Sequence, residues 1–118
     1  MPLTKDFTET IKARAKADRG FRVALLREAL EAIVNGELEV AKILLRDYVN
    51  ATCGFTELGD SIGKSPKSLM RMLSESGNPN AANLFSVTRD LLRRSGTSFT
   101  VVQGQDHKPA KGIRVANR

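Results

Sequence analysis

Apolar residues recur at intervals of three and four along most of this chain, which is the spacing of amphipathic helices. Glycines follow three of these segments, at Gly36, Gly54 and Gly96, and a glycine just past a helix end accommodates a positive φ. The last segment carries Phe85 on its apolar side. The pattern therefore predicts a protein built mainly from helices. The segments that carry it are residues 4–16, 21–34, 37–52 and 81–94.

The helical period stops after Gly96. Residues 97–102 (Thr-Ser-Phe-Thr-Val-Val) are rich in β-branched and aromatic side chains, which predicts a short strand. A lone strand leaves its backbone groups unpaired, so we expect it to pair with a second copy or a partner chain, or to pack loosely at the end of the domain. From Gln103 onward apolar periodicity is absent, and we expect residues 103–118 to form a disordered basic tail.

Residues 55–74 predict two short helices folded across a tight turn. Leu58 and Ile62 are four residues apart and share one face of the first helix. Gly59 lies on its inner side, where a missing side chain lets the second helix approach. Gly63 follows where the chain reverses, a position that favours positive φ.

The second helix of this pair begins at Ser65-Pro66, with Ser as the N-cap and Pro at the first helical position. Leu69, Met72 and Leu73 form its buried stripe. The outward face offers basic side chains and no acid, as a helix-turn-helix needs to enter a DNA major groove. An ordinary helical hairpin with solvated lysines is the alternative. The side chains left facing outward are Lys67, Ser68, Met70, Arg71 and Ser74.

The run Ser-Leu-Met-Arg-Met-Leu-Ser-Glu-Ser-Gly-Asn-Pro (residues 68–79) resembles the signature of HigA-like helix-turn-helix antidote (antitoxin) proteins of addiction modules. These are relatives of the Cro/repressor-type (Xre) regulators. The resemblance extends over about residues 21–102. Met70 stands where the family often has an aromatic residue, and Lys64 where many such motifs have an aliphatic one. The resemblance implies a repressor of its own operon that binds a RelE/HigB-like ribonuclease toxin.

The net charge of +6 at pH 7 is unevenly distributed. The first fifty residues are nearly balanced, with nine basic and eight acidic side chains. Residues 64–74 carry three basic side chains and no acid, and residues 80–118 carry seven basic side chains against two acids. Positive charge thus collects on the half that holds the helix-turn-helix pattern, which favours a nucleic-acid partner.

Composition and motifs argue against an enzyme, a metal site or a cofactor. A lone His107 in the predicted tail cannot assemble the three or four ligands of a metal site. Gly63-Lys64-Ser65 lacks the preceding strand and the glycine spacing of a phosphate-binding loop. Cys53 is alone, which excludes an intramolecular disulfide and fits a reducing compartment. No apolar stretch approaches a membrane span, and we expect a soluble cytoplasmic protein.

The sequence therefore predicts an all-α, lambda-repressor-like fold of five to six helices with a short C-terminal strand. We expect a helical extension over residues 1–20, the DNA-binding domain over 21–102 and the tail over 103–118. The predicted function is sequence-specific repression on double-stranded DNA as an antitoxin; a stand-alone regulator and a helical protein-interaction module remain the alternatives. The candidate DNA-binding residues are Thr56, Lys64, Ser65, Lys67, Ser68, Met70, Arg71 and Ser74.

Two further surfaces are candidates for protein partners. A homodimer is expected because one short helix reads only a few base pairs. We expect the dimer surface to include residues 97–102 and the helix before them. The apolar stripe formed by Phe7, Ile11 and Ala15 is expected either to dock on the domain or to reach a partner. A toxin is expected to use that stripe or residues 97–102.

Overall fold

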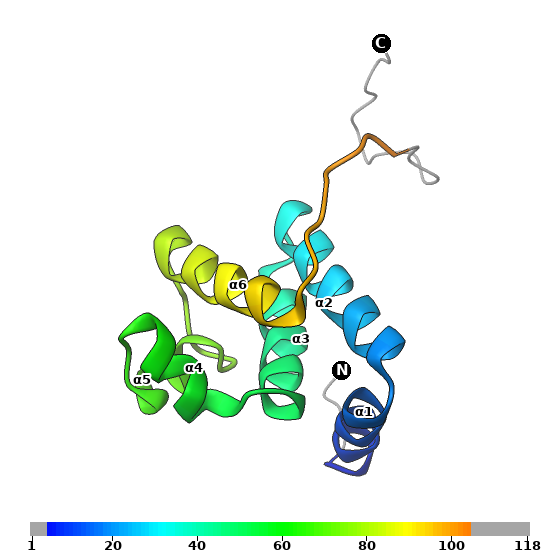
Figure 1. The fold of residues 1–118 in the computed structure, drawn as a ribbon. Helices are drawn as coiled ribbons and strands as arrows, with labels where there is room; N and C mark the ends of the chain where they lie inside the picture. The colour runs from blue at the N-terminus through cyan, green and yellow to red at the C-terminus, as the bar shows by residue number, and fades with distance from the viewer. Residues whose placement is uncertain (1–4, 105–118) are drawn as a thin grey trace.

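The computed structural model describes residues 5–104, with the backbone alone for residues 5–8. Within this range the chain is all-helical, and its predicted helices form with small shifts at their ends (Figure 1). The helices are α1 (Lys5–Ala17), α2 (Arg19–Val34), α3 (Leu38–Ala51), α4 (Gly54–Ile62), α5 (Pro66–Met72) and α6 (Ala81–Ser95).

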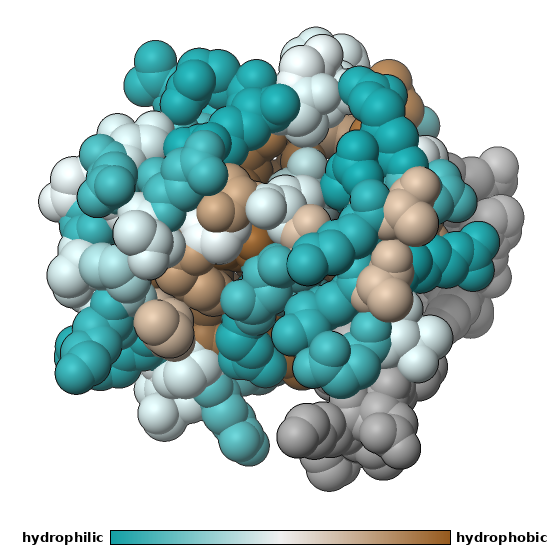
Figure 2. Space-filling model, turned by 60° about the horizontal axis from the view of Figure 1, so that its bottom comes forward, coloured by the Kyte–Doolittle hydropathy of each residue, from teal (hydrophilic) through white to brown (hydrophobic). Residues whose placement is uncertain are grey.

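Helix α3 lies at the centre of the fold. On one side α1 and α2 pack against it, and on the other side α4 does. The apolar stripes meet in one core, in which Leu26 of α2, Leu45 of α3 and Leu58 of α4 are fully buried. Figure 2 shows the result on one face, where hydrophilic side chains cover most of the surface and hydrophobic ones appear chiefly in a central hollow.

The apolar stripe of α1 docks on this domain. Ala15 is fully buried and Ile11 is partly buried against the core. These two side chains therefore pack within the chain, whereas use of the stripe by a toxin stays a prediction. The side chain of Phe7, the third member of the stripe, lies outside the described residues.

The predicted strand over residues 97–102 is absent from the described part of the chain, where residues 97–104 have no regular secondary structure. The regular elements among the described residues are all helices, so they provide no strand edge with which residues 97–102 could pair. Phe99 packs against the core instead, whereas Val101 and Val102 are exposed. The tail predicted to be disordered lies, from residue 105 on, outside the described residues, as does His107.

Helix α6 buries a narrower stripe than its sequence suggested. Leu84, Val87 and Leu91 face the core, but Phe85 is 60% exposed. Phe85 follows Leu84 directly and therefore lies at the edge of the buried stripe. The apolar spacing alone did not show whether a residue at this edge is buried or exposed. None of the described helices is both long enough and apolar enough to cross a membrane.

Candidate nucleic-acid interface

The turn between α4 and α5 has the predicted glycine geometry. Gly63 has a φ of 73°, in the left-handed region, and its N–H donates to the carbonyl of Gly59. Gly59 itself is buried, and a Cβ atom there would lie 2.3 Å from the Lys64 carbonyl oxygen. The close approach of the turn to α4 therefore requires a glycine at position 59.

The start of α5 is also as predicted. Ser65 has an extended backbone, and its Oγ accepts the Ser68 N–H at 3.0 Å. Pro66 occupies the first helical position, where no intrahelical N–H is needed. Leu69, Met72 and Leu73 face the core, so the inner side of α5 is fixed by packing.

The opposite side of α5 faces solvent. Lys67, Met70 and Arg71 are exposed, and Ser68 is half-buried. Ser74, just beyond the helix, is half-buried, and its hydroxyl donates to the Arg71 carbonyl at 2.7 Å.

The other candidate residues flank this face. Thr56 is exposed on α4, Ser65 is exposed at the start of α5, and Lys64 is half-buried in the turn. Within residues 5–104, no carboxylate pairs with Lys64, Lys67 or Arg71. The three cations around α5 are therefore available to an external anion.

The end of α5 is held by two side chains that sequence analysis missed. Lys42 of α3 is 1% exposed, and its Nζ donates to the carbonyls of Glu75 at 3.1 Å and Gly77 at 2.6 Å. One turn further along α3, Arg46 donates from Nη1 to the Leu73 carbonyl at 2.7 Å. These bonds satisfy carbonyls at and beyond the helix end, which have no partner inside α5. The signal in the sequence was two basic residues four apart on a mostly apolar helix.

Gly77 allows the following loop to fold back over this helix end. A Cβ atom at position 77 would lie 2.2 Å from the Arg71 carbonyl oxygen and 2.4 Å from that of Met72. The backbone at Gly77 is thus pressed against the last turn of α5, and the Lys42 amine holds it there. The orientation of α5 is consequently fixed at both ends.

Helix α6 braces α4 through a buried carboxylate. Asp90 is 5% exposed and accepts hydrogen bonds from Ser61 Oγ and Arg94 Nε, each at 2.6 Å, and from Arg93. Burial acts to raise the pKa of Asp90, but these hydrogen bonds outweigh it and lower the pKa below its usual range. Arg94 also bonds Glu57 of α4, with 2.8 Å between Nη1 and Oε2. Arg94 therefore serves the fold and is not free to bind a phosphate.

A shallow hollow of about 530 Å³ adjoins the exposed face of α5. It lies between α5 and the start of α6, and its lining includes Ser68 and Arg71 together with Asn78 and Asn83. Amide side chains of this kind bond both phosphates and base edges. Neither asparagine is among the candidate DNA-binding residues predicted from the sequence.

The described residues contain no group of three or more His, Cys, Asp or Glu side chains placed to hold a metal ion. Comparison with protein-family models, with curated proteins and with solved structures found nothing that matches this chain.

Proposed function

We propose that this chain is a sequence-specific double-stranded DNA-binding regulator that places α5 in the major groove. One observation carries the proposal: α5 presents unpaired cations on a helix whose inner face, start and end are all fixed by the fold. A fixed orientation allows a side chain to select a base edge, whereas a mobile lysine tail would recognise charge alone.

The roles of the side chains follow from their positions. Lys67, Ser68 and Arg71 face base edges, and Arg71 suits a two-pronged contact with guanine. Lys64 and Thr56 bind phosphates on either side, and the Ser65 hydroxyl reaches a third. Met70 and Ser74 lie at the margins of the same face, where Met70 offers an apolar contact to a thymine methyl group.

A seven-residue helix reads only a few base pairs, so we infer that two copies act on a two-fold operator. Half-sites would then lie about 10 bp apart, or a multiple of that spacing. Phe85 on α6 and the exposed Val101 and Val102 are apolar positions for contact between the copies.

The antitoxin role is a narrower proposal that is supported by the resemblance of residues 68–79 to HigA-like proteins. It predicts that the product of an adjacent gene is a small ribonuclease-like toxin that co-purifies with this chain. If co-expression of that neighbour yields no complex, a stand-alone regulator replaces the antitoxin. A helical protein-interaction module is the remaining alternative, and it predicts no DNA selectivity at all.

The DNA proposal is tested by selecting bound sequences from a random duplex pool and measuring affinity for the selected site. Arg71→Ala is expected to cost about 1–3 kcal/mol on that site and much less on scrambled DNA. Arg27→Ala is the matched control, since Arg27 is an exposed arginine on α2 and its loss changes the net charge equally. Equal losses for both variants, or no enriched sequence, would contradict the proposal.

A further inference from the structure

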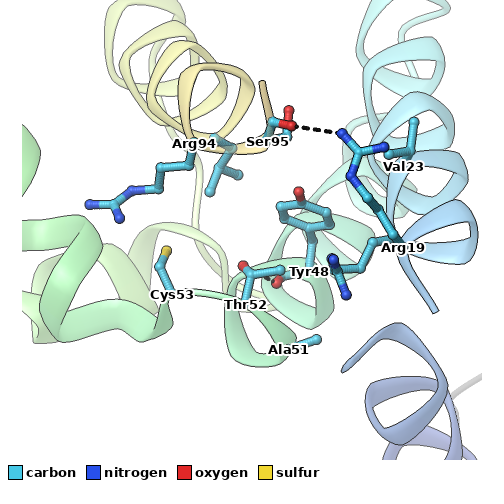
Figure 3. A pocket seen from close by; sticks show the side chains of 10 residues that line it. Arg19, Val23, Tyr48, Ala51, Thr52, Cys53, Arg94 and Ser95 are labelled. Atoms are coloured by element: carbon cyan, nitrogen blue, oxygen red, sulfur yellow. Dashed lines mark hydrogen bonds between the residues drawn. The ribbon is translucent and has the colours of Figure 1, made fainter. Parts of the chain in front are cut away.

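A second cavity, of about 340 Å³, lies away from the exposed face of α5 (Figure 3). Its walls come from the start of α2, the end of α3, the turn into α4 and the end of α6. A volume of this size is at the lower end of the range for small-molecule sites. The proposed DNA contacts make no use of it.

Tyr48 projects an unpartnered hydroxyl into this cavity. The residue is 4% exposed, and its hydroxyl forms no hydrogen bond within the described residues. In Figure 3 the hydroxyl points toward the end of α6, near Ser95. Burial is the largest influence on the pKa of Tyr48 and raises it, so at neutral pH the group keeps its proton and acts as a donor.

Two arginines beside Tyr48 are bonded to backbone carbonyls and to no carboxylate within the described residues. Arg19 donates from Nη2 to the Ser95 carbonyl at 3.2 Å, and Arg22 donates from Nη1 to the Ala15 carbonyl at 2.9 Å. Both acceptors are neutral, and neither arginine has a carboxylate within salt-bridge distance in the described residues. The nearby Asp18 carboxylate accepts the Phe21 N–H.

The remaining wall is largely apolar or neutral. Val23, Ala51 and Leu91 line it. Burial raises the pKa of the Cys53 thiol, which therefore stays uncharged at neutral pH. Arg94 also borders the cavity, but its charge is matched by Asp90 and Glu57, and in Figure 3 its guanidinium points away from Arg19.

We propose that this cavity binds a small organic carboxylate with an apolar body. The Tyr48 hydroxyl and the guanidiniums of Arg19 and Arg22 supply donors and positive charge for the carboxylate. The apolar body packs on Val23, Ala51 and Leu91. An inorganic anion would leave that apolar wall unused, and a neutral ligand would make no use of the positive charge of the two arginines.

The proposal is tested on the full chain with benzoate and hexanoate as probes, followed by backbone amide NMR shifts. We expect saturable shifts in residues 19–23, 48–53 and 91–95, with a dissociation constant of about 1 mM or tighter. Benzamide, the neutral analogue, and inorganic phosphate are expected to bind more weakly than benzoate. The test involves no DNA, so its failure would leave the proposed DNA interface untouched.

Two variants locate the site. Tyr48→Phe removes a hydroxyl that forms no hydrogen bond within the described residues, so we expect the fold to be kept and benzoate affinity to fall about fivefold. Arg19→Gln should weaken benzoate about tenfold or more, since a charge-assisted bond is lost. Arg27→Gln is the control, since Arg27 is an exposed arginine two turns further along the same helix and does not line the cavity.

Four results would overturn the proposal. The first is no saturable shift with either carboxylate. The second is equal binding of benzamide, and the third is phosphate binding as tight as that of benzoate. The fourth is equal weakening by Arg27→Gln and Arg19→Gln, which would indicate a diffuse charge effect.

Discussion

At the scale of single residues, two helical glycines in this chain have opposite roles. Gly59 lies where the turn after α4 presses against the helix, and any side chain there meets backbone. Gly20, near the start of α2, has room, because an added Cβ would meet only Asp18 Oδ1 at 3.4 Å. The same residue type is therefore required at one position and replaceable at the other.

Gly59→Ala is expected to lower the free energy of unfolding by about 2 kcal/mol or more, since backbone must move to accept the methyl group. Gly20→Ala should be neutral or stabilising by about 0.5 kcal/mol, because alanine favours the helix. Chemical denaturation of both variants measures the contrast. Equal stabilities would show that the turn can shift without cost.

Two buried carboxylates differ in their hydrogen bonding and in the direction of their pKa shifts. Asp90 is satisfied by Ser61, Arg93 and Arg94, and its pKa is lowered. Asp47 on α3 is 3% exposed, and its Oδ2 has no hydrogen-bond partner. Burial raises the pKa of Asp47 despite the nearby Arg46 and Lys12.

The signs of the two pKa shifts predict opposite responses to pH. A raised folded-state pKa means that the ionised Asp47 destabilises the fold at neutral pH, and that this penalty fades as pH falls through the raised value. Asp47→Asn should therefore be more stable than the wild type at pH 7, with the gain shrinking toward pH 4.

Asp90→Asn should show the reverse, because a lowered folded-state pKa means that the ionised Asp90 stabilises the fold until pH falls through that value. We expect a loss of roughly 3 kcal/mol at pH 7 that diminishes in acid. Urea denaturation of both variants from about pH 2 to pH 7 measures this, because the loss for Asp90→Asn diminishes only below the ordinary carboxyl pKa of about 4. If the free energy of unfolding varied with pH in the same way for the wild type and both variants, the opposite pKa shifts given to Asp47 and Asp90 would be wrong.

At the scale of elements, α5 depends on α3 for its position. Helix α5 has seven residues, too few to be stable alone, and its end is bonded by Lys42 and Arg46. The helix proposed to read DNA and the side chains that hold its end thus belong to different elements. We expect changes in α3 to reach DNA binding without touching the DNA face.

Lys42→Met keeps an unbranched side chain, one heavy atom shorter, but leaves the Glu75 and Gly77 carbonyls without their donor. The expected cost is about 1–3 kcal/mol of stability, together with faster amide hydrogen exchange in residues 73–77. Affinity for the selected DNA site should fall while the salt dependence of binding stays the same. Lys12→Met, which removes a surface pair with Glu9, is the control and should leave exchange in 73–77 unchanged.

At the scale of the whole molecule, some basic side chains are paired with acids inside the fold and others are not. Arg93 and Arg94 are bound to acids within the fold, whereas Lys64, Lys67 and Arg71 are not. Residues 103–118 add four more basic side chains, at Lys108, Lys111, Arg114 and Arg118. The DNA proposal therefore assigns sequence-specific attraction to the cations around α5 and part of the non-specific attraction to residues 103–118.

Deleting residues 103–118 is expected to leave the melting temperature almost unchanged, because that stretch has no apolar periodicity to bury. Non-specific DNA affinity and the slope of its logarithm against log salt should both fall, since fewer phosphates are neutralised. Titrations at several salt concentrations measure this. A large drop in melting temperature would show instead that these residues pack on the domain.

The sequence by itself determined the helices, the tight turn and the basic outward face. Each of these is set by local chemistry: apolar spacing, the Ser65 cap, the positive φ of Gly63, and Lys67 and Arg71 placed off the buried stripe. Local composition gave a wrong prediction where secondary structure depends on a neighbouring segment. Residues 97–102 have the composition of a strand, but no strand edge exists in the described part of the chain to receive them.

Only the tertiary structure decided how the ends of elements are held together. The sequence marks Lys42 as an ordinary charged residue, and its burial against the loop after α5 depends on a contact 33 to 35 residues away. The same holds for Asp90 bracing α4 and for the cavity around Tyr48, which is assembled from four separate segments. Contacts between residues so far apart in sequence have no periodic signature, because they depend on where whole helices come to rest.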